Sequence, residues 1–232
     1  MKYQKVVKAT FLRRPNRFVA FCMLNDEEVR CHVPNTGRCR ELLIPGRTVY
    51  LAMADNPNRA TKYSLIGVDK DGLMVNMDSG APNRAVEEAI YHIPFPGMGK
   101  TVWYKRECKY KDSRFDFMIK DESGKEGFVE VKGVTLFDGT AARFPDAPTV
   151  RGVRHIHELM GAVKEGYCAY ILFVIQGKGL DYVAPNDAGG TEFGDALRLA
   201  AANGVVPLAY DCTITPDEMT LDAPIPVVLS EQ

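Results

Sequence analysis

The sequence predicts an α/β protein, α+β overall, in which a small β-barrel is followed by a mixed α/β domain. About eighty N-terminal residues hold short apolar segments separated by turn residues, as strands and hairpins do. Beyond them, segments with helical spacing alternate with strand-like segments. The chain has 232 residues and 46% hydrophobic content, so it is long enough to bury a sizeable core.

The N-terminal part predicts an all-β unit. NRFVAFCMLNDEEVRCHV indicates a hairpin with strands near 17–24 and 28–33, joined by the polar turn NDE. The turn-rich PNTGRCRELLIPG leaves room for a short helical piece around 41–43, and RTVYLAMA is the next strand. YSLIGVDKDGLMVNMD predicts two more strands. About five short strands in about eighty residues suit a closed barrel of the OB type, with a small β-sandwich as the alternative.

The pattern changes near Asp78–Pro82, so we expect one domain over 1–80 and a second over 81–232. APNRAVEEAIYHI begins with a proline and has apolar residues at helical spacing. A later helix ends at Gly166, because glycine readily terminates helices. In order, the expected elements are a helix at 82–92, strands at 101–110, 114–120 and 128–136, a helix at 149–165, a strand at 167–176, a helix at 192–203 and a strand at 205–210.

Composition limits the class of protein. Lys plus Arg is 29 and Asp plus Glu is 30, a net charge of -1, so a site for a polyanion must be a local patch. The six cysteines form no C-x-x-C pair, which argues against zinc and suggests reduced thiols in a cytosol. The N-terminus lacks the apolar region of a signal peptide, and the apolar run AYILFVI is too short to span a bilayer. We therefore expect a cytoplasmic protein with no membrane partner.

The strand FVEVKGVTL carries two charges in an apolar setting. Glu130 and Lys132 are two residues apart, so the strand places both on one face. SRFDFMIK precedes this strand, and the polar loop DESGKEG between them predicts a hairpin. With the turn centred near Gly124, Asp116 lies roughly opposite Lys132, and Glu130 is its diagonal neighbour. The two carboxylates can then reach one ion.

Two carboxylates and a lysine suit phosphodiester chemistry. Hard carboxylate oxygens of Asp116 and Glu130 can hold Mg²⁺ or Mn²⁺, and Lys132 can orient a water or stabilise charge on phosphate oxygens. Acid, hairpin and acid-x-lysine is the layout of PD-(D/E)xK nucleases. Glu107 and Glu88 are further candidate metal ligands. A salt-bridged cluster on a solvated sheet face is the alternative explanation.

The helix TVRGVRHIHELMGAVKEG follows with a polar stripe. Arg151, His155 and Glu158 recur at steps of three and four residues, so they share a face. Arg151 can hold a phosphate and His155 can contact DNA. Arg114, two residues before Asp116, is a further candidate for DNA binding. A solvated helix face would explain the same pattern.

Long linked motifs connect the chain with a known family. HVPNTGR at 32–38, RECKYKDSRFDFM at 106–118, VEVKGVTL at 129–136 and FPDAPTVRGVRHIHEL at 144–159 resemble the sugar fermentation stimulation protein A family of bacteria and archaea. The resemblance implies an OB-fold, a PD-(D/E)xK nuclease-like domain, DNA binding and a role attributed to sugar (maltose) utilisation. By position its nuclease motif falls on Asp116, Glu130 and Lys132. The proline that often precedes the first acid is replaced here by Phe115.

The segment PNTGRCR is the candidate nucleic-acid contact of the barrel. Asn35 and Thr36 offer side-chain and backbone donors, and Arg38 and Arg40 add charge for phosphates. OB-folds bind single strands through such loops together with stacked aromatic rings. A purely structural turn is the alternative. The candidate stacking residues, each of which could equally be core, are Phe18, Phe21 and Tyr50.

Two functional hypotheses follow. The first is a metal-dependent DNA nuclease whose target can be single-stranded, duplex or structured DNA, with a homodimer as an arrangement such nuclease domains often adopt. The second is a non-catalytic DNA-binding regulator of sugar (maltose) metabolism. Two carboxylates facing a polyanion repel it unless a metal intervenes, which favours the first. A sugar-binding protein has little support, because Trp103 is the single tryptophan.

Overall fold

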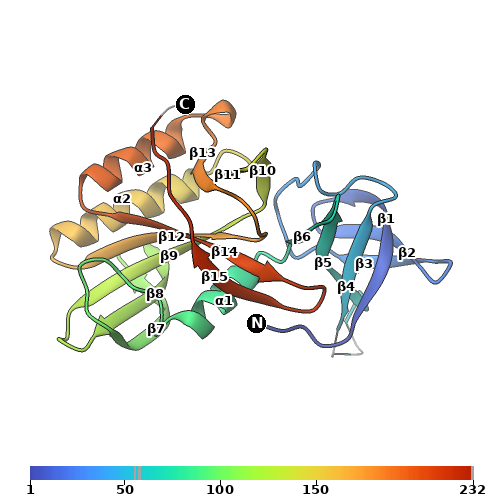
Figure 1. The fold of residues 1–232 in the computed structure, drawn as a ribbon, viewed down its shortest axis with the longest axis horizontal. Helices are drawn as coiled ribbons and strands as arrows, with labels where there is room; N and C mark the ends of the chain where they lie inside the picture. The colour runs from blue at the N-terminus through green and yellow to red at the C-terminus, as the bar shows by residue number, and fades with distance from the viewer. Residues whose placement is uncertain (55, 57–58, 231–232) are drawn as a thin grey trace.

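The computed structural model describes residues 1–54, 56 and 59–230, and it places a β-barrel beside a larger α/β domain (Figure 1). This confirms the predicted fold class. The barrel strands are β1 (Val6–Asn16), β2 (Val19–Leu24), β3 (Glu27–His32), β4 (Thr48–Met53), β5 (Tyr63–Lys70) and β6 (Leu73–Asn76).

The barrel closes through its strand pairing. Its strands run in the order β3-β2-β1-β4-β5-β6, and β3 also pairs with β5, which joins the two sides of the sheet. Alternate residues point inward, so Ala20 and Cys22 on β2 are fully buried. The closed OB-type barrel is therefore confirmed over the β-sandwich. The short helical piece expected around 41–43 is wrong, since that segment forms turns only.

The second domain is built on a six-stranded sheet in the order β15-β14-β12-β9-β8-β7, with a smaller sheet β10-β11-β13 beside it. Its elements are α1 (Ala81–Ala89), β7 (Thr101–Tyr110), β8 (Ser113–Asp121), β9 (Glu126–Val134), β10 (Leu136–Asp138), β11 (Ala141–Phe144), α2 (Val150–Lys164), β12 (Cys168–Ile175), β13 (Tyr182–Pro185), the 3₁₀ helix η1 (Asp187–Gly189), α3 (Glu192–Ala202), β14 (Val206–Ile214) and β15 (Met219–Pro224).

Helices cover both faces of the large sheet. On one face α2 and α3 pack through Ile156 and Phe193 against the apolar side chains of β9 and β12, and on the other α1 packs through Val86 (Figure 1). The central strand β12 is parallel to β9 and β14, which explains its unbroken apolar sequence. Thr149 caps α2 by accepting a hydrogen bond from the Gly152 N–H at 3.0 Å.

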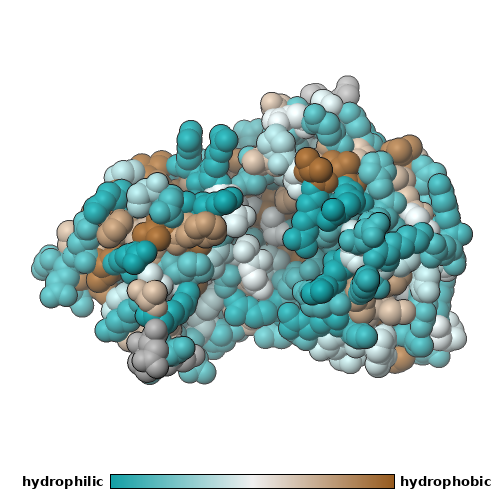
Figure 2. Space-filling model, turned by 180° about the vertical axis from the view of Figure 1, so that it is seen from behind, coloured by the Kyte–Doolittle hydropathy of each residue, from teal (hydrophilic) through white to brown (hydrophobic). Residues whose placement is uncertain are grey.

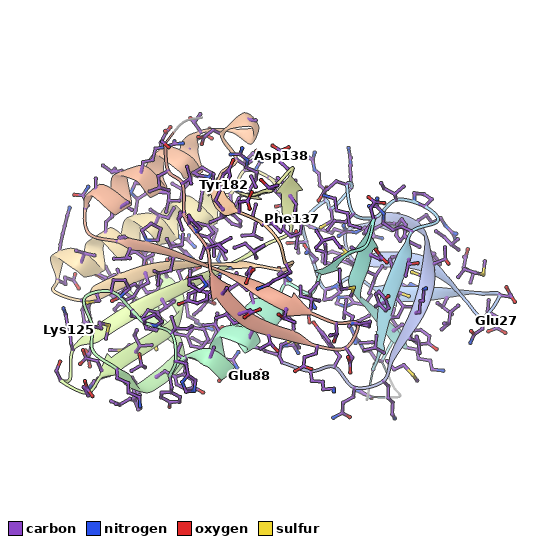
Figure 3. The ribbon with its side chains drawn as sticks, in the orientation of Figure 1. Glu27, Glu88, Lys125, Phe137, Asp138 and Tyr182 are labelled. Carbon is purple, nitrogen blue, oxygen red and sulfur yellow. The ribbon has the colours of Figure 1, made fainter. Side chains whose placement is uncertain are left out.

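The barrel contacts the second domain through buried and half-buried hydrogen bonds. Gln176, just after β12, donates its side-chain amide to the carbonyl oxygens of Asn76 and Asp78 at 3.2 and 3.1 Å. Lys70 on the barrel donates to the Phe137 carbonyl oxygen at 3.3 Å, and Figure 3 shows Phe137 on the side of the second domain that faces the barrel. The face seen in Figure 2 is mostly hydrophilic and is hollowed between the two domains.

Among the residues that the structure describes, no helix is both long and apolar enough to cross a membrane.

Candidate active site

The two strands that carry the predicted acids separate at the site. The β8–β9 ladder pairs Phe117 with Val129 as its last pair, and the same register places Asp116 across from Glu130. The prediction that Asp116 lies opposite Lys132 is therefore wrong by two residues. The cause is the hairpin loop, because the Asp121 carboxylate accepts hydrogen bonds from the backbone N–H groups of Ser123 and Lys125, both at 2.9 Å, and closes it early.

Asp116 occupies the gap where the strands part. Its Oδ2 accepts a hydrogen bond at 2.8 Å from the N–H of Val131, a group that the ladder no longer pairs. Its Oδ1 accepts one at 2.7 Å from the side-chain amide of Asn83 on α1. Burial and the nearby Glu130 carboxylate raise the pKa of Asp116 to about 6. Asn83 was missed from the sequence, where nothing singled it out from the polar residues of its helix.

Glu130 is buried, at 4% exposed, and is held through one oxygen only. Its Oε1 accepts hydrogen bonds from Lys132 Nζ at 2.6 Å and from His155 Nδ1 at 2.5 Å. Burial opposes ionisation, but these two donors outweigh it and lower the pKa of Glu130. Its Oε2 is buried with no hydrogen-bond partner. A charged oxygen without a partner is costly, so its environment suits a cation.

His155 was predicted to contact DNA, and the structure contradicts this. The imidazole is 2% exposed and packs edge-on against the ring of Phe115. Its Nδ1–H donates to Glu130, while its Nε2 accepts a hydrogen bond from Arg151 Nε at 3.3 Å. The periodicity correctly found a polar face of α2, but that face turns toward the sheet. His155 is a residue that positions Glu130, and Arg151 remains exposed beside it.

The weaker metal candidates are engaged elsewhere. Glu88 accepts a hydrogen bond at 2.6 Å from the ammonium group of Met1. Glu107 pairs with Arg114 at 3.4 Å, and both side chains are more than half exposed. The described part of the chain contains no cluster of three His, Cys, Asp or Glu side chains arranged for a metal. A cation here would be held by Asp116 and Glu130 together with ligands from outside the protein, and the unpartnered Oε2 of Glu130 fits that role.

The PNTGR loop is partly structural. Asn35 donates its side-chain amide to the Met77 carbonyl oxygen at 2.9 Å and accepts from the Gly37 N–H at 2.7 Å, so its polar atoms are occupied. The structural-turn interpretation therefore holds for Asn35. Thr36, Arg38 and Arg40 are exposed and stay candidate contacts.

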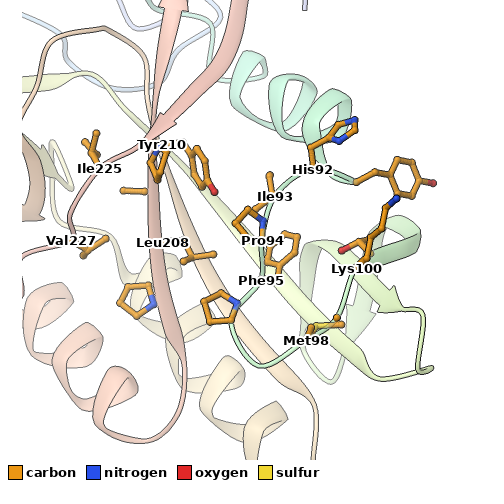
Figure 4. A pocket seen from close by; sticks show the side chains of 17 residues that line it. His92, Ile93, Pro94, Phe95, Met98, Lys100, Leu208, Tyr210, Ile225 and Val227 are labelled. Carbon is orange, nitrogen blue, oxygen red and sulfur yellow. The ribbon is translucent and has the colours of Figure 1, made fainter.

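A separate groove of about 750 Å³ lies between the segment 91–101, β14 and the C-terminal segment (Figure 4). It is lined mainly by apolar side chains, among them Phe95, Leu208 and Ile225. None of the three proposed catalytic residues lines it. Its position and chemistry separate it from the site at Asp116 and Glu130.

Replacing His155 by Ala tests its positioning role. We expect stability to fall by about 1–3 kcal/mol, because Glu130 loses a buried donor. We also expect Mn²⁺ affinity to fall by roughly 10–100-fold, as the loss of a partner that orients a ligand usually does. Urea unfolding and Mn²⁺ titration measure the two effects. Unchanged Mn²⁺ affinity in a folded variant would show that His155 is only a core residue.

Replacing Asp116 by Asn should raise the stability of the fold, in contrast to His155→Ala, by an amount that depends on pH. A pKa raised from 3.8 to about 6 means that the folded state carries the charge reluctantly above pH 6. The raised pKa of Asp116 corresponds to a loss of about 3 kcal/mol in the free energy of unfolding, which Asn would remove. Asn also loses one hydrogen bond, which lowers the gain by about 1 kcal/mol. In EDTA at pH 8 we expect the variant to be about 1–2 kcal/mol more stable than wild type.

The advantage of Asp116→Asn should shrink as the pH falls from 6 toward 4, since protonation then neutralises Asp116 in the wild type as well. Urea unfolding at pH 8, 6 and 4.5 measures this. Equal stability of the two proteins at pH 8 would show that burial and Glu130 do not destabilise the charged form of Asp116.

The comparisons with known proteins agree with this architecture. Residues 12–77 match the family described as SfsA N-terminal OB domain, and residues 80–218 match the sugar fermentation stimulation protein RE domain. A sugar fermentation stimulation protein homolog of Clostridium acetobutylicum is 46% identical over 99% of this chain and 100% of its own length. One from Ruminiclostridium cellulolyticum is 49% identical over 92% of this chain and 93% of its own.

Among solved structures, Pyrococcus furiosus SfsA in complex with Ca²⁺ superimposes with a TM-score of 0.87 at 30% identity, covering 98% of both chains. A repair endonuclease from Pyrococcus abyssi shows only weak similarity, with a TM-score of 0.28 at 13% identity. The matches to both domains and the full-length relatives lead to one conclusion: this chain belongs to the sugar fermentation stimulation protein family.

Proposed function

We propose that this protein is a divalent-metal-dependent nuclease that hydrolyses DNA phosphodiesters. The observation that carries the proposal is the Glu130 carboxylate, buried with Oε2 unpartnered and set close enough to Asp116 to raise its pKa. Two carboxylates held in such proximity are unfavourable unless a cation joins them. A domain that only bound DNA would be weakened by that negative charge.

Each residue has a distinct role in the proposed reaction. Asp116 and Glu130 would hold Mg²⁺ or Mn²⁺. A bound cation of this kind polarises the phosphodiester and lowers the pKa of a water. Lys132 keeps its hydrogen bond to Glu130 and is placed to orient the attacking water or to stabilise negative charge on phosphate oxygens. His155 and Asn83 fix the two carboxylates from opposite sides of the sheet.

The relative from Pyrococcus furiosus supports a divalent cation. That protein was solved with Ca²⁺, a hard cation that takes oxygen ligands. We infer that the present chain also binds a divalent cation, with Mg²⁺ or Mn²⁺ as the catalytic metal. We propose that the domain of residues 1–80 binds the DNA and that the domain of residues 81–232 cleaves it.

Metal-dependent cleavage of labelled DNA tests the proposal. Products should form with Mg²⁺ or Mn²⁺, and EDTA should abolish them. The Asp116→Asn variant is the control against a contaminating nuclease, because it should retain the fold and lose the activity.

A further inference from the structure

The barrel carries a group of cations with no counter-charge. Arg17 on the β1–β2 hairpin and Arg38 and Arg40 after the PNTG turn line a cavity of about 410 Å³. All three are exposed, and within the described residues none of them forms an ion pair. Arg13 lines the same cavity, but Glu28 binds its guanidinium at 2.6 and 2.7 Å. The free positive charge is therefore concentrated on Arg17, Arg38 and Arg40.

An exposed aromatic ring adjoins these cations. Phe18 is 50% exposed, and the Arg17 guanidinium lies 5.0 Å from the centre of its ring. The side chain of Asn16 holds this hairpin turn by accepting the N–H groups of Phe18 and Val19 at 2.9 and 3.1 Å. An exposed aromatic ring beside unpaired arginines offers stacking for a base and charge for a phosphate.

Arg14 makes this surface rigid. Its guanidinium donates to the backbone carbonyl oxygens of Arg17, Asn35, Gly37 and Arg38, at 2.7 to 2.9 Å. The hairpin and the PNTGR loop are thereby joined through one half-buried side chain. A ligand meets a site that is already organised, so little conformational entropy is lost on binding.

A second, smaller cavity adjoins the first and is lined by residues of both domains. It has a volume of about 150 Å³ and shares Thr36 and Gly37 with the arginine-lined cavity. Gly37 permits this close approach, because a Cβ there would lie closer than 3 Å to the Asp146 carboxylate. Arg143 lines the cavity from the second domain, and its ion pair with Asp138 is long at 3.9 Å.

Two lining residues of the smaller cavity are close in sequence to residues of the active site. Gly133 lines it and directly follows Lys132 on β9. Ser79 lines it and precedes α1, whose Asn83 holds Asp116. The exposed Asp146 carboxylate in this cavity repels phosphate but can accept a hydrogen bond from the amino group of an unpaired base.

We propose that the protein binds single-stranded DNA along this track, from Arg17, Phe18, Arg38 and Arg40 on the barrel, through the interdomain cavity past Arg143, toward Lys132. A single strand can turn its bases onto Phe18 and into the smaller cavity. A duplex keeps its bases paired and stacked, so neither contact is available to it. The direction toward Lys132 rests on the proposed nuclease function, whereas the binding itself does not.

Fluorescence anisotropy in EDTA tests the proposal, because no cutting occurs without metal. The probes are a labelled 20-nucleotide strand of mixed sequence and the same strand in a duplex. We expect the single strand to bind at least about tenfold more tightly. The Phe18→Ala variant should bind the single strand about tenfold more weakly, because one stacking contact contributes about 1–3 kcal/mol. The Phe18→Trp variant should restore the affinity.

Charge variants locate the track. We expect a severalfold loss of affinity for the single strand in each of the variants Arg17→Ala, Arg38→Ala and Arg143→Ala. Each should also reduce the slope of log affinity against log salt by about 0.7. The matched controls are Arg30→Ala on the barrel and Lys164→Ala on the second domain, both exposed cations outside the two cavities. They should change affinity less than twofold.

Three results would overturn the inference: duplex binding as tight as single-strand binding, equal losses in the control variants, or no loss in Arg143→Ala. The inference and the proposed function fail separately. Duplex cleavage without single-strand binding would remove the track and keep the nuclease. Single-strand binding with these variant effects, but no cleavage in any metal, would keep the track and remove the nuclease.

Discussion

Replacing Glu130 by Gln is expected to abolish cleavage and to weaken Mn²⁺ binding by more than about 100-fold, since loss of a direct ligand exceeds the 10–100-fold cost of losing a partner that only orients one. The substitution keeps the shape of the side chain and an oxygen that can accept from Lys132 and His155. It removes the negative charge that the unpartnered Oε2 presents to a cation. Isothermal titration with Mn²⁺ measures the loss directly.

Glu126→Gln is the matched control for this experiment. Glu126 lies on the same strand, where it pairs with Lys120 at 3.0 Å at the opposite end of the hairpin. Its replacement should leave Mn²⁺ affinity unchanged. A rise in melting temperature on adding Mn²⁺ gives a second measurement, because a cation that binds only the folded state stabilises it. Full Mn²⁺ affinity in folded Glu130→Gln would remove Glu130 from the metal site.

Replacing Lys132 by Met is expected to lower the cleavage rate by about 10²–10³-fold, the usual cost of losing one donor to transition-state charge, or about 2.7–4 kcal/mol. Methionine retains the length and apolar body of the side chain but has no ammonium group. Lys132 is only 13% exposed, so its charge acts in a poorly solvated place. Mn²⁺ affinity should be retained or increased, because a positive charge beside the cation is removed.

The separation of rate from metal affinity is the informative result for Lys132. Lys120→Met, which removes the exposed partner of Glu126, should change neither quantity. If Lys132→Met cut DNA at the wild-type rate, Lys132 would only be the counter-ion of Glu130. If it lost metal affinity together with rate, its role would be to hold Glu130 in place rather than to act on the substrate.

The strands of the site were predictable because their composition is strong. Val129 and Val131 flank Glu130, and apolar runs of this kind identify β9 and β12 as central strands. The error in register did not separate the acids, because Asp116 lies near Glu130 whether the two are diagonal or directly opposed. The hydrogen bonds of Asp121 that set the true register depend on the folded loop.

Other features depend on tertiary packing. The strand β1 was not predicted, although residues 8–11 alternate between exposed and buried; only Ala9 and Phe11 are buried, so its apolar pattern is short. The strands β10, β11 and β13 are only three or four residues long, too short for a periodic pattern. Periodicity placed His155 on a polar helix face but could not show that Glu130 lies opposite that face.

The arginine-lined surface illustrates the same limit. Arg38 and Arg40 stood out in the sequence as neighbours of the PNTG turn. Arg17 lies on another strand connection and joins them only when the barrel closes and Arg14 binds both segments. The sequence also could not separate free arginines from paired ones such as Arg13.

Whether the carboxylate pair and Lys132 hydrolyse DNA is measured by cleavage of end-labelled single-stranded, duplex and flapped DNA, by the wild-type protein and by Lys132→Met, with Mn²⁺, with Mg²⁺ and with EDTA. We expect metal-dependent products from wild type, strongly reduced products from the variant, and none in EDTA. Absence of products from every substrate, in wild-type protein shown by titration to bind Mn²⁺ and by anisotropy to bind DNA, would contradict this expectation. The carboxylate pair would then hold a metal that bridges the protein to DNA phosphates without hydrolysing them.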